Sequence, residues 1–185
     1  MQFVINRHIR HLVLKIYQLK CLIKNDRIKM VIINNFKEFE TYLGKELGVS
    51  EYLKVTQEQV NLFADATLDH QWIHVDVEKA KKESPFKSTI AHGYLTLSVL
   101  PYLWEQIAQV NNVKSLINYG IEKLKFNQPV LVGSEIRLRV TLQSIVNLRG
   151  VVKAEMKTTM EIKDSKKSAF DGVIVFLYNF EEGSI

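Results

Sequence analysis

The sequence of 185 residues is poor in cysteine, proline and glycine: it has one Cys, three Pro and eight Gly. With Cys21 as its only thiol, the chain cannot form an internal disulfide or a metal site built on several thiolates. The lone cysteine suits a reducing compartment, and we expect the cytoplasm. No apolar run reaches the ~20 residues that a membrane-spanning helix requires. The apolar fraction of 46% favours one ordinary globular domain.

Positive charge is scarce outside one segment, although the whole chain has a formal net charge of +5. Residues 1–29 contain seven Lys or Arg and one acidic residue, a net charge of +6, so residues 30–185 carry −1. A body that is nearly neutral gives no electrostatic support for binding to nucleic acid. We therefore expect no nucleic-acid partner.

Residues 1–29 combine this basic charge with apolar residues at helical spacing, as in Ile5, Ile9 and Leu12. One interpretation is an amphipathic membrane-surface helix or a targeting segment. The other is an extension outside the working domain, either an unpacked appendage or an over-long start before Met30. We favour the second and predict a single domain over residues 30–185, with no membrane contact.

The first half of this domain has helix signals. Asn35 is a suitable N-cap with Glu38 three residues later, and Gly44 or Gly48 would end that helix. The capping box Thr56-Gln-Glu-Gln59 predicts a helix that runs to about Thr67. Two further helices are predicted, from Val77 to about Lys82 behind an Asp76 cap, and from Ala91 to Val110. The last is apolar nearly all round, which predicts a buried helix of roughly 30 Å that Pro101 kinks or divides.

The second half alternates apolar and polar residues with the period of strands. The predicted strands are Glu122–Phe126, Ile136–Gln143, Val152–Ile162 and Ala169–Phe180, with hairpin turns at Asn147–Gly150 and Lys163–Lys167. Helices followed by antiparallel strands indicate the α+β class. The arrangement that buries most apolar surface is a long central helix wrapped by an antiparallel sheet.

Asp69 and His74 are the first candidate site residues, because they follow the predicted helix end at Thr67 in a loop. A carboxylate and an imidazole at this spacing can address one water molecule as an acid and a base. Alternatively, Asp69 is a turn residue and His74 a hydrogen-bonded core histidine. The spacing alone favours the second interpretation.

The pair His92-Gly93 opens the most apolar helix. The first N–H groups of a helix lack intrahelical partners, and glycine lets a ligand carbonyl approach the backbone closely. This pattern suits an oxyanion site, although a helix start that needs glycine for packing explains it as well.

A metal site is a further alternative. Its possible ligands are Asp69, His70, His74, Asp76 and His92. The i, i+4 spacing of two of these histidines has no meaning in a loop, so we expect neither a metal nor another cofactor.

Three motifs in one order resemble the MaoC-like dehydratases, which include the (R)-specific enoyl-CoA hydratases. They are Phe63-Ala-Asp-Ala-Thr-Leu-Asp-His-Gln-Trp-Ile-His74, Ile90-Ala-His-Gly-Tyr94 and Phe126-Asn-Gln-Pro-Val-Leu-Val-Gly-Ser-Glu135. The similarity extends from about Phe36 to Phe180 and is greatest to the branch that includes nodulation protein N. The resemblance implies a hot-dog fold, which is usually paired as a homodimer.

The resemblance also implies a reaction. Asp69 and His74 would hold the water that adds across a trans-2-enoyl thioester of CoA or acyl-carrier protein, and the N–H of Gly93 would bind the thioester carbonyl. The product would be a (R)-3-hydroxyacyl thioester. The neighbouring substrate-binding residues would be Gln71, Trp72, Ala91 and His92. A thioester hydrolase and a non-catalytic acyl-binding module on the same fold remain alternatives.

The sequence departs from the pattern of these hydratases at three positions near Asp69, one of them directly before it. They have glycine where this chain has Leu68, and asparagine and proline where it has Gln71 and Trp72. If the backbone at Leu68 has a positive φ, leucine strains the loop by about 1 kcal/mol or more.

Overall fold

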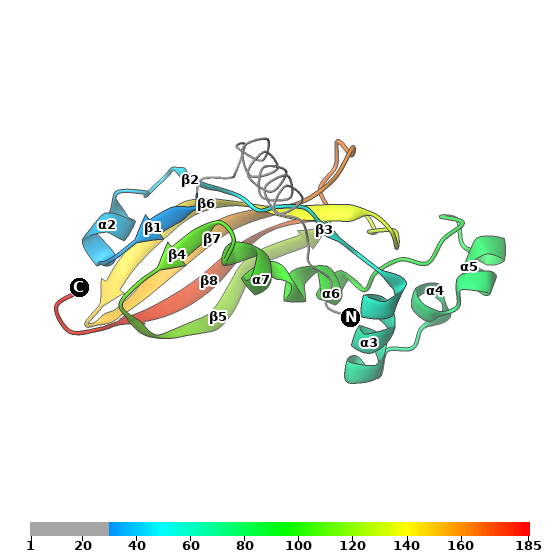
Figure 1. The fold of residues 1–185 in the computed structure, drawn as a ribbon, viewed down its shortest axis with the longest axis horizontal. Coiled ribbons are helices and arrows are strands. Elements are labelled where there is room, and N and C mark those ends of the chain that lie inside the picture. Colours follow the sequence, from blue (N-terminus) through cyan, green and yellow to red (C-terminus); the bar gives the residue numbers. More distant parts are fainter. Residues whose placement is uncertain (1–29) are drawn as a thin grey trace, which may run out of the picture.

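The computed structural model describes residues 30–185 (Figure 1). The interpretations given above for the basic extension of residues 1–29 lie outside the described residues. The strands are β1 (Val31–Ile33), β2 (Glu46–Val49), β3 (Leu53–Lys54), β4 (Ala108–Val110), β5 (Val113–Phe126), β6 (Glu135–Leu148), β7 (Val151–Ile162) and β8 (Phe170–Phe180). The helices are α2 (Phe36–Glu40), α3 (Gln57–Thr67), α4 (Trp72–Val75), α5 (Val77–Glu83), α6 (Gly93–Ser98) and α7 (Leu100–Trp104). Among the helices of residues 30–185, none is long and apolar enough to cross a membrane.

A six-stranded antiparallel sheet forms the body of the domain. Its order is β2-β6-β7-β8-β5, and β3 also pairs with β6. The β6–β7, β7–β8 and β5–β8 ladders extend along most of their strands, whereas β1 and β4 form a separate parallel pair. The predicted α+β class is confirmed by this combination of helices with one large antiparallel sheet.

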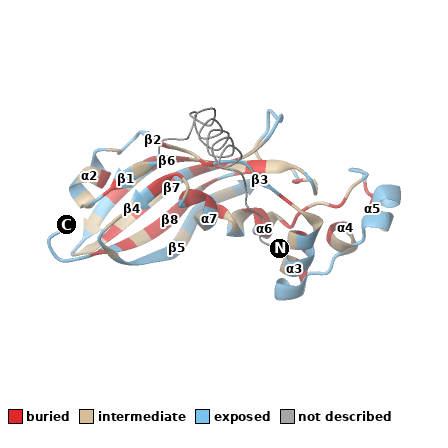
Figure 2. Ribbon diagram, in the orientation of Figure 1, coloured by how far each residue is buried: buried red, intermediate tan, exposed pale blue. Residues whose placement is uncertain are grey.

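The core lies between the inner face of the sheet and the segment that contains α6 and α7. Residues of β6 and β7 alternate between buried and partly exposed, as their sequence pattern predicts (Figure 2). Leu103 and Trp104 of α7 are almost fully buried, and the Trp104 ring stacks against Phe176 of β8 with centroids 6.5 Å apart. This packing fixes the position of the helices over the sheet.

The prediction of one buried helix from Ala91 to Val110 is wrong in length and in burial. The segment forms α6 and α7, divided at Val99, and its last residues form β4. Pro101 lies in the first turn of α7, where it needs no N–H partner, so the helix restarts there. Exposed Tyr94 and Tyr102 show that one face is not covered by the described residues.

The other predicted helices and strands differ from the observed ones mainly in where they begin and end. Helix α3 ends at Thr67 as predicted, and the helix from Asn35 is only five residues long, with Gly44 in the following turn. The two hairpin turns are confirmed. Strand β5 begins at Val113 rather than at Glu122. Its first residues show little alternation in burial, and they are extended because they pair with β8. Strands β1, β2 and β4 were not predicted.

The helices that carry the candidate motifs gather at one end of the sheet. In Figure 1, α3, α4 and α5 lie beyond the end of the sheet opposite to α2, and α6 begins close to them. The connections between these elements therefore meet at a single place, where the motifs converge.

Candidate active site

A pocket of about 400 Å³ lies between the start of α6, helix α4 and the segment that follows β5. Its lining contains His74, Ile90, Ala91, Gly93, Thr96, Phe126, Asn127, Gln128, Pro129 and Val130. Two of the three sequence motifs thus form opposite walls of one cavity, and the first motif supplies His74.

Asp69 is presented by the end of α3. The capping box at Thr56 and Gln59 fixes the start of this helix, and Leu68 ends it in the left-handed conformation, with φ of 62° and ψ of 19°. This turn directs the chain back towards α6, where Nε2 of His92 donates a hydrogen bond to the backbone carbonyl of Asp69 at 2.9 Å. The carboxylate itself stays about half exposed.

His74 is held in the short helix α4, and its side chain is buried. Its Nδ1 lies 2.8 Å from the backbone carbonyl of Ile90. Because a carbonyl oxygen only accepts hydrogen bonds, Nδ1 carries the ring proton of the neutral imidazole. Nε2 therefore has a free lone pair, as a proton acceptor requires.

His92 occupies the N-cap position of α6 and contacts both Asp69 and His74. Its ring stacks on that of His74 with centroids 3.8 Å apart, and Phe63 packs against it at 5.2 Å. Its Nε2–H is used by the Asp69 carbonyl, and its Nδ1 is buried with no hydrogen-bond partner in the described part of the chain. His92 is thus a positioning side chain rather than one that reaches the cavity.

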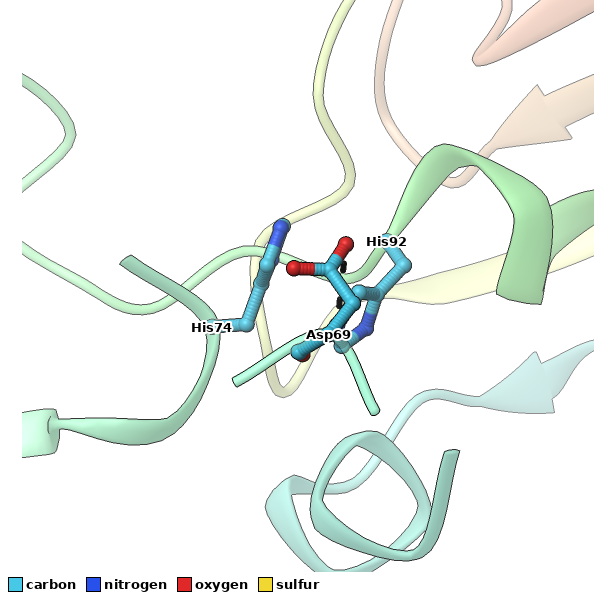
Figure 3. A group of neighbouring side chains, drawn as sticks. All are labelled: Asp69, His74 and His92. Atoms are coloured by element: carbon cyan, nitrogen blue, oxygen red, sulfur yellow. Dashed lines mark hydrogen bonds and ion pairs between the residues drawn. The ribbon is translucent and has the colours of Figure 1, made fainter. Parts of the chain in front are cut away.

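The side chains of Asp69, His74 and His92 converge from three segments (Figure 3). One ligand-type atom from each lies within 4.8 Å of those of the other two. A single water molecule can therefore bridge Asp69 and His74, because each of its hydrogen bonds spans about 2.8 Å.

The same three residues are the ones in residues 30–185 that could hold a metal ion. The ring nitrogen of His92 closest to the Asp69 carboxylate, at 3.9 Å, is the Nε2 that carries a proton. A metal would have to displace that proton and break the hydrogen bond to the Asp69 carbonyl. The other sequence candidates are elsewhere: His70 is near Asp65 at 3.6 Å, and Asp76 caps α5.

Gly93 is the first residue of α6 and lines the cavity. Its N–H donates to no atom of the described residues. A Cβ atom at this position would lie 3.2 Å from the ring of Phe126, tighter than ordinary packing. Close packing against Phe126 therefore favours glycine at this position, and the N–H group that begins α6 is available to a ligand.

The structure brings together only part of the predicted substrate-binding set. Ala91 lines the cavity, whereas Gln71 and Trp72 do not. Trp72 instead carries Nζ of Lys79 over its ring, 4.9 Å from the centroid. Residues 126–130 form a wall of the cavity that was not among the predicted site residues, although the third sequence motif starts at Phe126.

Leu68 has a positive φ, so the conformation that we predicted to be strained is confirmed. Replacing Leu68 by Gly is expected to raise the free energy of unfolding by about 0.5–1 kcal/mol, because the strain of about 1–2 kcal/mol exceeds the entropy that glycine adds to the unfolded chain. The side chain is 82% exposed, so little packing is lost. Urea unfolding of the purified protein measures the change. Leu68→Ala keeps a Cβ atom and should gain nothing; a Gly variant less stable than the wild type would contradict the strain.

Comparison with known proteins agrees with the three motifs. Residues 38–164 match the model of the MaoC-like domain family. The chain is 50% identical over 127 residues to 3-hydroxyacyl-thioester dehydratase Z of Mycobacterium tuberculosis, covering 68% of this chain and 83% of that protein. It is 39% identical over 142 residues to nodulation protein N of Rhizobium leguminosarum, covering 75% and 88%.

A solved structure supports the fold. The (R)-hydratase PhaJ1 of Pseudomonas aeruginosa superposes with a TM-score of 0.59 at 19% identity, covering 75% of this chain and 83% of that one. The predicted hot-dog fold is confirmed at this level, with a helical segment shorter than expected. From the family match over most of the domain, the motifs and the shared fold, we conclude that this chain belongs to the MaoC-like dehydratase family and is an enzyme of the dehydratase and hydratase kind.

Proposed function

We propose that the protein, working in the cytoplasm, catalyses the reversible addition of water to trans-2-enoyl thioesters to give (R)-3-hydroxyacyl thioesters. The observation that carries the proposal is the placement of Asp69 and His74 within reach of one water, next to a cavity that His74 and Gly93 line. The N–H of Gly93 donates to no atom of the described residues. The thioester dehydratase that is 50% identical supports the substrate class.

The proposed mechanism assigns one task to each group. The Asp69 carboxylate accepts a hydrogen bond from the water, and the free Nε2 of His74 takes its other proton as the oxygen bonds to C3 of the substrate. The N–H of Gly93 stabilises the negative charge that develops on the thioester oxygen. His74 then returns the proton to C2, so that both parts of the water enter the product. Dehydration is the reverse sequence.

The buried surroundings favour this chemistry. His74 and His92 are both largely buried, and their stacked rings would repel each other if both were charged. The hydrogen bonds to the carbonyls of Ile90 and Asp69 fix each ring in one orientation before substrate arrives. Such preorganisation lowers the cost of reaching the reactive geometry.

The direct test is to mix the full chain with crotonyl-CoA and follow the loss of the conjugated enoyl absorbance. Hydration removes the absorbance without releasing thiol. Release of free thiol would instead indicate a thioester hydrolase. Binding without either reaction, across several acyl chain lengths, would indicate an acyl-binding module and overturn the proposal.

We further propose that the protein forms a homodimer through β5. This strand is at the edge of the sheet, and its exposed apolar residues include Leu116, Ile117, Tyr119 and Ile121. An unpaired edge with an apolar surface is a typical site of association between copies of a chain.

The double substitution Ile117→Lys/Ile121→Lys is expected to convert the dimer to a monomer, because both lysines would have to be desolvated in the interface. Light scattering coupled to gel filtration measures the mass. Val146→Lys is the matched control, since Val146 is 48% exposed on a different strand, β6. A wild type that is already monomeric, or a double variant with unchanged mass, would contradict the β5 interface.

A further inference from the structure

A second, polar depression has a volume of about 380 Å³. It is formed by the β7–β8 hairpin together with the outer face of β6 and β7. Its lining comprises Tyr52, Arg137, Thr159, Glu161, Ile162, Asp164, Ser165, Lys166, Lys167 and Ser168. The hairpin, orange in Figure 1, extends towards the end of the sheet where α3, α4 and α5 lie.

Hydrogen bonds connect the lining of this depression with that of the reaction pocket. Gln128, which lines the reaction pocket, donates from Nε2 to Oγ of Ser165 at 2.8 Å and to the carbonyl of Lys167 at 2.6 Å. Asn127 donates from Nδ2 to Oγ of Ser168 at 2.8 Å. A molecule that leaves the reaction pocket over Gln128 therefore arrives at the hairpin.

Arg137 provides a cation that is already fixed in place. Its Nε donates to Glu161 at 2.6 Å, and its guanidinium lies over the ring of Tyr52 at 4.8 Å. The terminal nitrogens of Arg137 have no hydrogen bond to the described residues. A guanidinium with free terminal N–H groups in a rigid setting is well suited to bind two oxygens of a phosphate.

Glu161 does not neutralise this cation fully, because it is shared. Its second oxygen accepts from Nε of Arg139 at 2.7 Å. Partial burial opposes ionisation of Glu161, but the hydrogen bonds from Arg139 and Arg137 hold its pKa below the usual range. The Glu161 carboxylate holds two guanidinium groups, of which Arg139 also binds Glu46.

The hairpin adds two more cations. Lys166 and Lys167 are exposed, and neither forms an ion pair with a carboxylate of residues 30–185. The acids that line the depression are Glu161 and Asp164, so its three basic residues outnumber them. This local excess of positive charge contrasts with the net charge of −1 for residues 30–185 as a whole.

We propose that the depression binds the phosphate of the substrate's carrier, with Arg137 at its base and Lys166 and Lys167 at its rim. This inference rests on the proposed function, because an acyl thioester with its carbonyl at Gly93 must lead its carrier out of the pocket. CoA and acyl-carrier protein both attach the acyl group through a pantetheine arm that ends in a phosphate. The site thereby selects thioesters with a phosphorylated carrier.

The test compares crotonyl thioesters of N-acetylcysteamine, of 4′-phosphopantetheine and of CoA as substrates of the full chain. For Lys166→Glu/Lys167→Glu, KM for the CoA thioester is expected to rise about tenfold with kcat unchanged, because two attractive charges become repulsive. KM for the N-acetylcysteamine thioester, which has no phosphate, should stay the same. Added salt should raise the wild-type KM for CoA but not that of the variant.

The phosphopantetheine thioester identifies which phosphate is bound. A raised KM with this substrate assigns the site to the pantetheine phosphate shared by both carriers, whereas an effect confined to CoA assigns it to the nucleotide phosphates. Lys37→Glu, on α2 at the opposite end of the sheet, is the matched control and should change nothing. An unchanged KM for CoA, or an equal rise for the N-acetylcysteamine thioester, would overturn the proposal.

Calorimetric titration with CoA itself separates this inference from the proposed function, since it requires no turnover. The wild type is expected to bind CoA, and both the lysine variant and Arg137→Gln should bind it about tenfold more weakly. Thermal melts of both variants establish that they fold. If the wild type hydrates no enoyl thioester but binds CoA in this lysine-dependent way, the reaction proposal fails and the phosphate site stands. If it hydrates all three thioesters equally well, the reaction stands and the phosphate site fails.

Discussion

Replacing Asp69 by Asn, or His74 by Ala, is expected to lower kcat for enoyl thioester hydration by about 10²–10⁴, the usual contribution of a positioned acid or base. The amide of Asn can still contact the water but has no negative charge to orient and polarise it. Ala at position 74 removes the imidazole whose Nε2 is free to accept a proton because its Nδ1 is bonded to the carbonyl of Ile90. Stopped-flow absorbance at saturating substrate measures kcat for each variant.

The two substitutions should leave the fold intact, which separates a catalytic role from a structural one. Asp69 is half exposed, so its variant should melt close to the wild type. His74 is buried and bonded to Ile90, so its variant is expected to lose some stability while remaining folded. Asp65→Asn, an exposed carboxylate on α3, is the matched control and should retain full activity. Activity near the wild-type level in folded Asp69→Asn would contradict the assignment.

Replacing Gly93 by Ala is expected to lower kcat/KM by roughly 10–10²-fold, less than the 10²–10³ for complete loss of an oxyanion donor, because the N–H remains. The added methyl group occupies the space through which a thioester oxygen would approach that N–H. It also lies 3.2 Å from the ring of Phe126, which must move. Steady-state kinetics with crotonyl-CoA measure the loss.

One further variant divides this effect into its causes. The double variant Gly93→Ala/Phe126→Leu relieves contact with the ring but keeps the methyl group beside the N–H. If it recovers wild-type activity, the loss came from the displaced ring and the oxyanion role of Gly93 is refuted.

The sequence predicted well those parts of the fold that are determined by interactions between residues close together in the chain. The capping box at Thr56 and Gln59 starts α3, and the side chain of Asp76 caps α5, both through hydrogen bonds within three residues. Alternation predicted β6 and β7 because one face of each packs on the core. The motif that places Asp69 directly after a helix end is likewise local.

The errors occur where distant segments decide the conformation. The residues of β4 continue an apolar pattern that suits a helix, but pairing with β1, more than seventy positions earlier, makes them a strand. Exposed residues carry no periodic signal, so the first half of β5 could not be predicted without its ladder to β8. Neither Gln71 nor Trp72 lines the cavity, and a role for them in substrate binding stays a prediction.

By itself, the sequence determined the helix caps, the alternating strands and the identity of the residues with acid, base and glycine chemistry. These follow from interactions across a few positions, which the order of residues specifies directly. Only the tertiary structure decided that the side chains of Asp69, His74 and His92 converge, that His74 and Gly93 line one cavity, and that hydrogen bonds from Gln128 link this cavity to a basic depression. Contacts between distant segments form when the helices and the sheet bury their apolar faces together, and that packing is a property of the whole domain.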